Sequence, residues 1–180
     1  MRALGEQIGV HATAIYRHFP NREDLLIAVS DELFRQMVER LDSRLQNPRE
    51  RIINVMVVAR EVFSEHPNYV VPLITHPGNS VQGGILTLQV IANLEAMGLS
   101  GENLVLGHQM LESYVLGANA FDFSSAPNHL EERRLRRRQL EHPDFDATSR
   151  TQEQIEAINL KAYIQGGNAI LDACEALARA

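Results

Sequence analysis

Apolar residues recur at every third or fourth position along almost the whole of this chain, and almost no stretch alternates apolar with polar residues. The first spacing places apolar side chains on one face of an α-helix, whereas alternation is typical of a half-buried strand. The chain is therefore predicted to be all-α. Its 180 residues, of which 44% are apolar, suffice for one sizeable core or for a small module beside a larger one.

Glycine, proline and capping residues divide this helical pattern into segments. Gly9 is suited to end a first helix, and Asn21, Ser80 and Thr151 are suited to cap later ones. The helix that follows Asn21 carries one apolar stripe as far as Leu45. The predicted helices are 2–8, 11–18, 22–46, 48 to the His-Pro pair at 66–67, 68–75, 81–97, 101–122 and 151–178, with a short charged helix over 128–141.

Two domains follow from this division. Residues 1–46 are predicted to form a small head with a connecting helix, and residues 47–180 a larger helical domain. The net charge of −6 argues against non-specific binding of nucleic acid over the whole surface. A local basic face is still compatible with the sequence, because residues 1–22 contain three arginines and a single glutamate.

The only cysteine, Cys174, lies in a helical apolar setting, so we expect a buried thiol with no redox role. One cysteine cannot form a disulfide within the chain, which suits a reducing cytosol. The N-terminus has no apolar segment of signal-peptide type, and the longest apolar runs are too short to span a bilayer. These features predict a soluble, cytoplasmic protein with no membrane partner.

Residues 2–18 fit a helix-turn-helix, in which two short helices are joined by a tight turn at Gly9. Gly5 is small enough to let the two helices approach closely. The apolar residues expected to lie between the helices are Leu4, Ile8, Val10, Ile15 and Phe19.

The second of these helices presents Thr13, Tyr16 and Arg17 on its outer face. Hydroxyl, phenol and guanidinium groups suit phosphates and base edges, and such a helix enters the major groove by its N-terminal end. An ordinary helical hairpin with a hydrated polar face is the alternative. The predicted DNA-binding residues are His11, Ala12, Thr13, Tyr16, Arg17, His18 and Arg22, of which the first three are placed for base reading.

The run "GVHATAIYRHFPNREDLL" (9–26) resembles the recognition helix and following helix start of the tetracycline-repressor (TetR) family of transcriptional regulators. More loosely, "AREVFSEHP" (59–67), "YVLGANAF" (114–121) and "YIQGGNAILDACEAL" (163–177) resemble the C-terminal domains of that family. The residues that match the sharper N-terminal pattern are Gly9, Val10, Ile15, Tyr16, His18, Phe19, Pro20, Asn21 and Arg22.

The resemblance implies a three-helix DNA-binding head, a helical effector domain and a homodimer that reads a palindromic operator. It assigns phosphate contacts to Tyr16, His18 and Arg22. Family members carry another helix before this pair, whereas the sequence here starts at Met1, within what would be the second helix of the head. We therefore expect a head that lacks part of its apolar cover.

The helices after residue 47 are expected to enclose an effector pocket. For each candidate residue, a plain position in the core is the alternative. No histidine in this half pairs with another histidine at i+3 or i+4, so neither a metal site nor a cofactor is expected. The predicted pocket residues are Phe63, His66, Leu73, Leu86, Val90, Met110 and Tyr114.

Small residues in the last two long helices suit close packing between subunits, which is where the resemblance places the dimer interface. A glycine inside a helix costs about 1 kcal/mol relative to alanine, so close packing would have to offset that cost. A bend near Gly166 is the alternative. The predicted interface residues are Gly117, Ala118, Gly166, Gly167, Ala169 and Ala173.

Together these features predict a ligand-responsive, DNA-binding transcriptional regulator, and specifically a repressor released from its operator by a small, largely apolar effector. A helical protein-interaction adaptor without DNA binding is the alternative. No Gly-rich phosphate loop or nucleophile elbow occurs, so an enzyme is not expected. The arginines within 133–138 suggest either contact with nucleic acid or a solvated face balanced by nearby glutamates.

Overall fold

The computed structural model describes residues 1–75, 80–123, 139, 142–145 and 150–179. The described residues contain helices and no strand, as predicted for an all-α chain. The charged helix predicted over 128–141 and the arginines within 133–138 lie outside the described residues, apart from Gln139. The helices are α1 (Arg2–Ile8), α2 (Ala12–His18), α3 (Arg22–Arg40), α4 (Pro48–Glu65), α5 (Val70–Thr75), α6 (Val81–Ala96), α7 (Gly101–Phe123) and α9 (Gln152–Ala178), with 3₁₀ turns η1 (Pro67–Tyr69) and η2 (Pro143–Phe145).

The N-caps expected from the sequence are confirmed. Asn21 Oδ1 accepts the backbone N–H of Asp24 at 2.8 Å, and Ser80 Oγ accepts that of Gly83 at 2.9 Å. Thr151 begins α9 with a capping box, in which its side chain and that of Gln154 each bond the backbone N–H of the other residue. These side chains satisfy N–H groups that have no partner within the first turn of their helices.

The prediction that one helix runs from 22 to 46 is wrong, because α3 ends at Arg40 and Leu41 is extended. The chain then turns back toward the start of α4. Asn54 Oδ1 accepts the backbone N–H of Asp42 at 2.9 Å, and Arg51 Nε donates to the carbonyl of Leu45 at 2.7 Å. Leu41 keeps the apolar spacing of the helix but reaches the core from this connection.

The helices from α3 to α9 form what we call the body, and two groups of buried side chains make up its core. Helix α4 contributes to both groups. The α3 cluster is Leu33, Met37, Val58, Ala59, Val62, Phe63, Val70 and Leu86. The α9 cluster is Ile52, Met56, Leu94, Leu99, Leu111, Tyr163, Leu171 and Cys174. Burial raises the pKa of the Cys174 thiol, so this residue is the protonated, buried side chain that its setting predicted.

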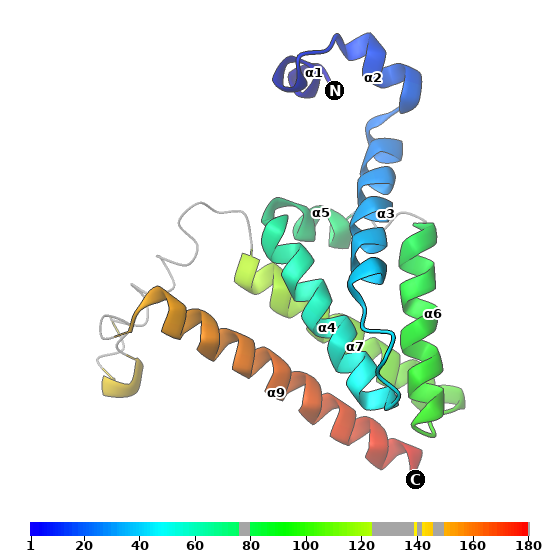
Figure 1. Cartoon of the computed structure of the whole chain (residues 1–180), viewed down its shortest axis with the longest axis vertical. Helices are drawn as coiled ribbons and strands as arrows, with labels where there is room; N and C mark the ends of the chain where they lie inside the picture. Colours follow the sequence, from blue (N-terminus) through cyan, green and yellow to red (C-terminus); the bar gives the residue numbers. More distant parts are fainter. Residues whose placement is uncertain (76–79, 124–138, 140–141, 146–149, 180) are drawn as a thin grey trace.

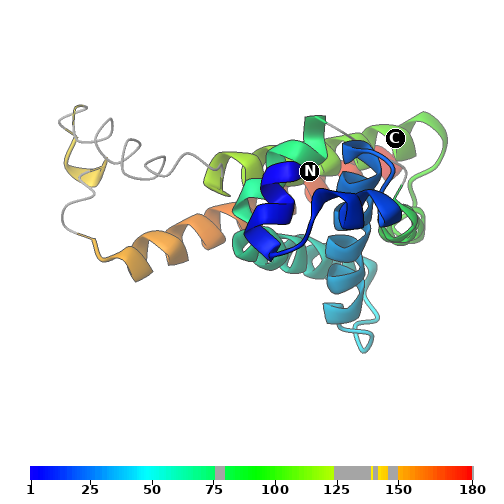
Figure 2. The ribbon, with the colours of Figure 1, turned by 90° about the horizontal axis from the view of Figure 1, so that it is seen from above.

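The start of α4 is tied to the C-terminal half of α9 by one arginine. The guanidinium of Arg49 lies 2.7 Å from the carboxylate of Asp172 and 2.8 Å from that of Glu175, and it also bonds the carbonyl of Asn168 at 3.0 Å. The N-terminal half of α9 extends beyond the other helices in both views of the ribbon (Figures 1 and 2). None of the described helices is long and apolar enough to cross a bilayer.

The helix pair α1–α2 stands at the N-terminal end of α3, away from the body (Figure 1). Ile15 is buried between the two helices, and Leu4 and Phe19 are half-buried. The prediction that Ile8 and Val10 also point inward is wrong, because these side chains are 58% and 42% exposed. Two short helices share only one interface, which is too small to cover all five apolar side chains.

This small interface predicts that the head unfolds locally before the body does. Local opening free energies are lowest where few apolar side chains are buried. We expect the amides of α1 and α2 to exchange with solvent from states at least about 2 kcal/mol lower in free energy than those that expose α4. Hydrogen exchange resolved by residue measures this difference, and equal protection of α2 and α4 would contradict it.

Candidate nucleic-acid interface and cavity

The turn between α1 and α2 depends on two glycines, Gly5 and Gly9. Gly9 adopts the left-handed conformation with φ of 73°, and the N–H of Val10 donates to the carbonyl of Gly5 at 2.9 Å, which is the bond that ends a Schellman motif. Gly5 is buried, and a Cβ at this position would lie 2.6 Å from the carbonyl oxygen of Val10. The prediction that Gly5 permits close approach of the two helices is therefore confirmed.

His11 is the N-cap of α2. Its Nδ1 accepts the backbone N–H of Thr13 and lies 2.8 Å from the hydroxyl of the same residue. Because Nδ1 acts as an acceptor, the proton of the neutral ring is on Nε2, which is then a hydrogen-bond donor. The sequence suggested only a base-reading role for His11, and the structure shows that it also fixes the first turn of α2.

The outer face of α2 and the start of α3 carry hydrogen-bond donors directed to solvent. Tyr16 is 50% exposed, and Arg17, His18 and Arg22 are exposed as well. Within the described part of the chain, these four side chains form no hydrogen bond or ion pair. Their donor groups are thus available to a partner, and Ala12 and Thr13 lie beside them on the first turn of α2.

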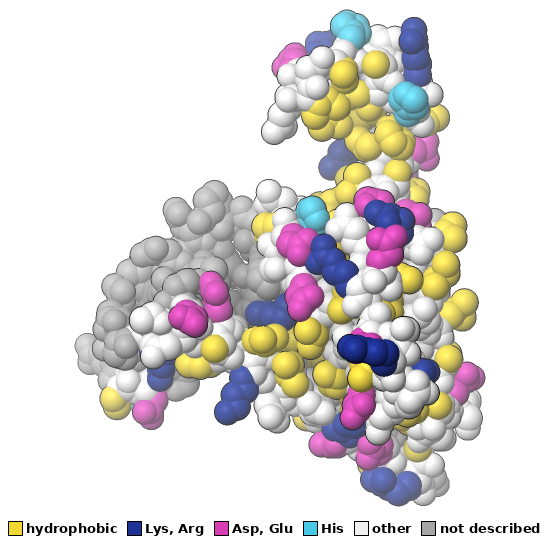
Figure 3. Space-filling view, in the orientation of Figure 1, with side chains coloured by type: hydrophobic (Ala, Val, Ile, Leu, Met, Phe, Trp, Pro, Cys, Tyr) yellow, Lys and Arg dark blue, Asp and Glu magenta, His cyan; other side chains and the backbone are white. Residues whose placement is uncertain are grey.

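The start of α3 carries charges of both signs, because Glu23 and Asp24 follow Arg22 in its first turn. Arg22 is the first residue of this helix, where a guanidinium is repelled by the positive end of the helix dipole. The same end attracts anions, because the first N–H groups of a helix lack partners within it. The exposed Arg22 guanidinium is the group at this terminus that suits a phosphate, and Glu23 and Asp24 offset part of its charge. Figure 3 shows histidine, lysine or arginine side chains around the head, with acidic side chains fewer there than on the body.

Besides the Arg40–Glu65 ion pair at its C-terminal end, two sets of hydrogen bonds join α3 to the rest of the body. The Asp31 carboxylate accepts the Ser80 hydroxyl at 2.7 Å and the backbone N–H of Gln82 at 2.8 Å, and these bonds hold its pKa below the usual value. One residue earlier, the buried Ser30 lies 3.0 Å from the hydroxyl of Tyr69, which also donates to the carbonyl of Leu26. We call the first set, between Asp31 and the first turn of α6, the Asp31 clasp.

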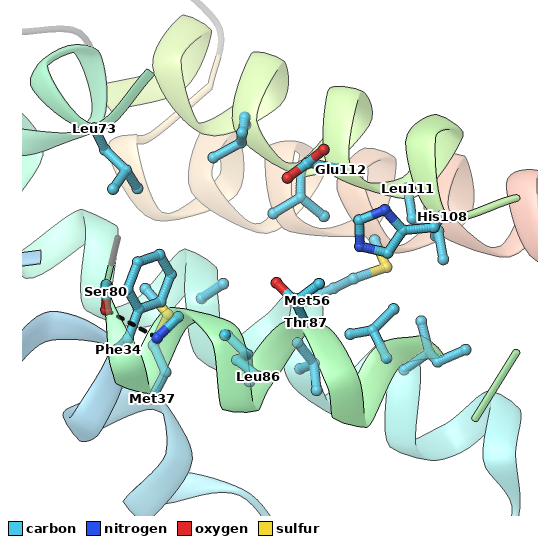
Figure 4. Close-up of a pocket in the computed structure, with 18 of the residues that line it drawn as sticks. Phe34, Met37, Met56, Leu73, Ser80, Leu86, Thr87, His108, Leu111 and Glu112 are labelled. Carbon is cyan, nitrogen blue, oxygen red and sulfur yellow. Dashed lines mark hydrogen bonds between the residues drawn. The ribbon is translucent and has the colours of Figure 1, made fainter. Parts of the chain in front are cut away.

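A cavity of about 360 Å³ lies in the body between α3, α4, α6 and α7 (Figure 4). This volume falls within the usual range for small-molecule sites, about 300–1,000 Å³. Its walls are mostly apolar. The lining residues are Phe34, Met37, Ile52, Val55, Met56, Ala59, Phe63, Leu73, Ser80, Gly83, Gly84, Leu86, Thr87, Val90, His108, Leu111, Glu112, Val115 and Leu116.

Comparison with known families agrees with this geometry. Residues 1–29, which include the whole helix-turn-helix, match the family model described as bacterial regulatory proteins, tetR family. The N-terminal helix-turn-helix is therefore that of a TetR-family regulatory protein. An HTH-type transcriptional regulator of Saccharopolyspora erythraea is 26% identical over 142 residues. The match spans 79% of this chain and 59% of that relative's length.

Solved structures share the fold over nearly the whole chain. The transcriptional regulator SCO7222, a TetR from Streptomyces coelicolor, superposes with a TM-score of 0.73 at 20% identity, covering 98% of this chain and 87% of that one. BioQ from Mycobacterium smegmatis superposes with a TM-score of 0.67 at 23% identity, covering 98% and 86% of the two chains. At these identities the likeness establishes the fold alone.

Four of the residues predicted to form a pocket line the cavity, namely Phe63, Leu73, Leu86 and Val90. The other three lie elsewhere. His66 is exposed at the C-cap of α4, and Met110 is not among the lining residues. Tyr114 faces α9 instead, where its ring stacks on Tyr163 and its hydroxyl donates to that residue's carbonyl at 2.9 Å.

Sequence reasoning missed the polar and α3 residues of the cavity. Phe34 and Met37 bring α3 itself into the wall. His108 and Glu112 lie one turn apart on α7, and their i, i+4 spacing in the sequence is the signal that could have identified them. No group of three or more potential metal ligands occurs among the described residues.

The predicted dimer residues divide between the interior and the surface of this subunit. A Cβ on Gly166 would lie 2.1 Å from the hydroxyl oxygen of Tyr114, and one on Gly167 would lie 2.2 Å from Cε of Met56. These two glycines therefore allow α9 to pack on α7 and α4 of its own chain. Gly117 and Ala169 are exposed, whereas Ala118 and Ala173 are half-buried.

The close contact at Gly5 predicts that Gly5→Ala loosens the head without unfolding the body. The added methyl group meets backbone atoms, and overpacking of this kind costs about 1–3 kcal/mol. Trypsin should therefore cleave after Arg17 at least about fivefold faster. Mass spectrometry of a proteolysis time course measures this rate. Gly84→Ala, where a Cβ would meet no atom within 4 Å, is the control. A rate that is unchanged in Gly5→Ala would contradict the prediction.

Proposed function

We propose that this TetR-family protein is a DNA-binding transcriptional repressor that a small molecule releases from its operator. The observation that supports this most directly is the solvent-facing row of unpaired donors on α2 and at the start of α3. Phosphates and base edges are suitable partners for such groups. The similarity to an HTH-type transcriptional regulator of Saccharopolyspora erythraea supports the same function.

In the proposed complex, α2 enters the major groove by its N-terminal end. His11, Ala12 and Thr13 then face base edges, with Nε2 of His11 as a donor and the methyl group of Ala12 as an apolar contact. Tyr16 and Arg22 lie further along, where the sugar-phosphate backbone passes. His18 and Arg17 add donors at the C-terminal end of α2.

A second copy of the chain would supply the second head. A palindromic operator presents its half-sites about 34–36 Å apart, which one head alone cannot span. The exposed apolar side chains of α7 and α9 suit this association, because α7 carries Val105, Leu106 and Phe121 at 67%, 46% and 57% exposure and α9 carries Ile158 at 50%. In the proposed dimer these faces pack against their own copies in the partner subunit.

The proposed coupling runs through α3. Its Phe34 and Met37 line the cavity, and Asp31 holds Ser80, which also lines it. A molecule in the cavity would therefore contact the same helix that carries the head at its other end. To weaken operator binding tenfold, the molecule needs about 1.4 kcal/mol of preference for the state with displaced heads.

The first test of this function is the salt dependence of Arg22→Gln. Each lost phosphate contact lowers the slope of log K against log salt by about 0.9, so we expect the slope to fall by about one for each head. Fluorescence anisotropy with a duplex that the wild-type protein selects from a randomised library measures this slope.

Arg44→Gln is the matched control for this test, because Arg44 is an exposed arginine on the connection between α3 and α4. We expect its slope to equal that of the wild type. A chain that selects no duplex, or an Arg22→Gln variant with an unchanged slope, would favour the protein-interaction adaptor instead.

The dimer is tested by Gly117→Glu. A side chain on Gly117 meets no atom of its own subunit within 4 Å, so the fold of the subunit should tolerate it. Across a two-fold interface the new carboxylate would approach its own copy, and like charges would repel each other. We expect the dissociation constant of the dimer to rise at least about tenfold, as measured by sedimentation.

The control for the dimer test lies on another apolar surface. Leu88 on the outer face of α6 is 65% exposed, and Leu88→Glu should leave the dimer intact. If Leu88→Glu produced monomers and Gly117→Glu did not, α6 would form the interface in place of α7 and α9.

A further inference from the structure

One wall of the cavity carries polar side chains that have no partner in the described part of the protein. His108 and Glu112 project from α7, and Thr87 faces them from α6 (Figure 4). No hydrogen bond or ion pair joins these three side chains to any other described residue. Ser80 differs from them, because its hydroxyl is already engaged by Asp31 and by the backbone N–H of Gly83.

The charge of the lining is one-sided. Glu112 is the only carboxylate among the lining residues, and no lysine or arginine is present there. Glu112 is also exposed, so its carboxylate lies where a ligand entering from solvent can reach it. An anionic ligand would be repelled by this wall, whereas a cation would gain an opposite charge within reach.

We infer that the cavity binds an amphiphilic primary amine. A protonated amine has three N–H donors, and the polar wall offers three kinds of side chain that can accept them: the Glu112 carboxylate, the His108 imidazole and the Thr87 hydroxyl. The apolar body of the ligand then lies along the remaining wall, toward Phe34 and Leu73 (Figure 4). This inference rests on the proposed function only in taking the cavity as the effector site.

Three probes with one apolar body separate the contribution of charge from that of shape. 4-Phenylbutylamine, 4-phenylbutan-1-ol and 4-phenylbutyrate carry a positive, neutral and negative end group at neutral pH. We expect the amine to bind at least about tenfold more tightly than the alcohol, which corresponds to about 1.4 kcal/mol, and the carboxylate to bind most weakly. Isothermal titration calorimetry measures the dissociation constants, which should be about millimolar or below for ligands of this size.

The Glu112→Gln variant tests the residue that carries the inference. It removes the charge but keeps the shape and an acceptor, and its exposed position makes unfolding of the variant unexpected. We expect the amine to lose about tenfold in affinity and the alcohol to bind as before. Glu102→Gln, an exposed residue in the first turn of the same helix and outside the cavity, should change neither value.

Several results would overturn the inference. The first is that 4-phenylbutyrate binds as tightly as 4-phenylbutylamine. The second is that Glu112→Gln leaves the affinity for the amine unchanged, and the third is that none of the three probes binds at millimolar concentration.

The proposed function is tested separately, by titrating the ligand-free protein with duplex DNA. If the protein binds DNA but none of the probes, the inference of an amine ligand is wrong and the proposed regulatory function is unaffected. If the amine binds through Glu112 but the protein selects no duplex, the proposed regulatory function is wrong and the inference of an amine ligand is unaffected.

Discussion

The attachment of α3 to the other helices of the body is the constraint on which the rest of the structure depends. The head buries few side chains of its own and stands at the end of this helix, so its orientation is set by what holds α3 (Figure 1). The Asp31 clasp supplies part of that hold, and its hydrogen bonds lower the pKa of the Asp31 carboxyl. A lowered pKa means that the clasp stabilises the fold above the ordinary pKa of aspartate and loses this contribution as the pH falls through the lowered value.

The clasp also brings the cavity close to α3. Ser80 begins α6, bonds Asp31 and lines the cavity, so the first turn of α6 belongs to both features. A Cβ on Gly83 in the same turn would lie 3.0 Å from the Phe34 ring, which shows how closely α3 and α6 approach. Tight packing of this kind transmits small displacements, because protein interiors are nearly as dense as organic crystals. The α9 cluster, by contrast, is tied by Arg49 and lies farther from the head.

Local chemistry was predictable from the sequence, whereas contacts between distant helices were not. Asn21, Ser80, Thr151 and Gly9 act as caps and stops because their side chains or φ angles act within a few residues. The spacing of apolar residues identifies the apolar face of a helix but not the helix that packs against that face. Tyr114 was therefore placed in the pocket, although it packs on α9, and the glycines at 166–167 were placed between subunits, although they contact Tyr114 and Met56. Leu41 and Leu45 extended the helical spacing past Arg40, where side chain–backbone bonds redirect the chain.

The two ends of the cavity belong to different parts of the molecule, and this arrangement limits how a ligand can act. His108 and Glu112 lie on α7, whereas Phe34 and Met37 lie on α3 (Figure 4). A ligand held at its polar end by α7 alone would bind both states of the dimer equally and would shift no population, however tight its binding. Only the contacts of its apolar body with α3 and with the first turn of α6 can differ between the states. In the proposed mechanism, the polar wall would therefore select the ligand, and the length and shape of the apolar body would determine whether that ligand moves the heads.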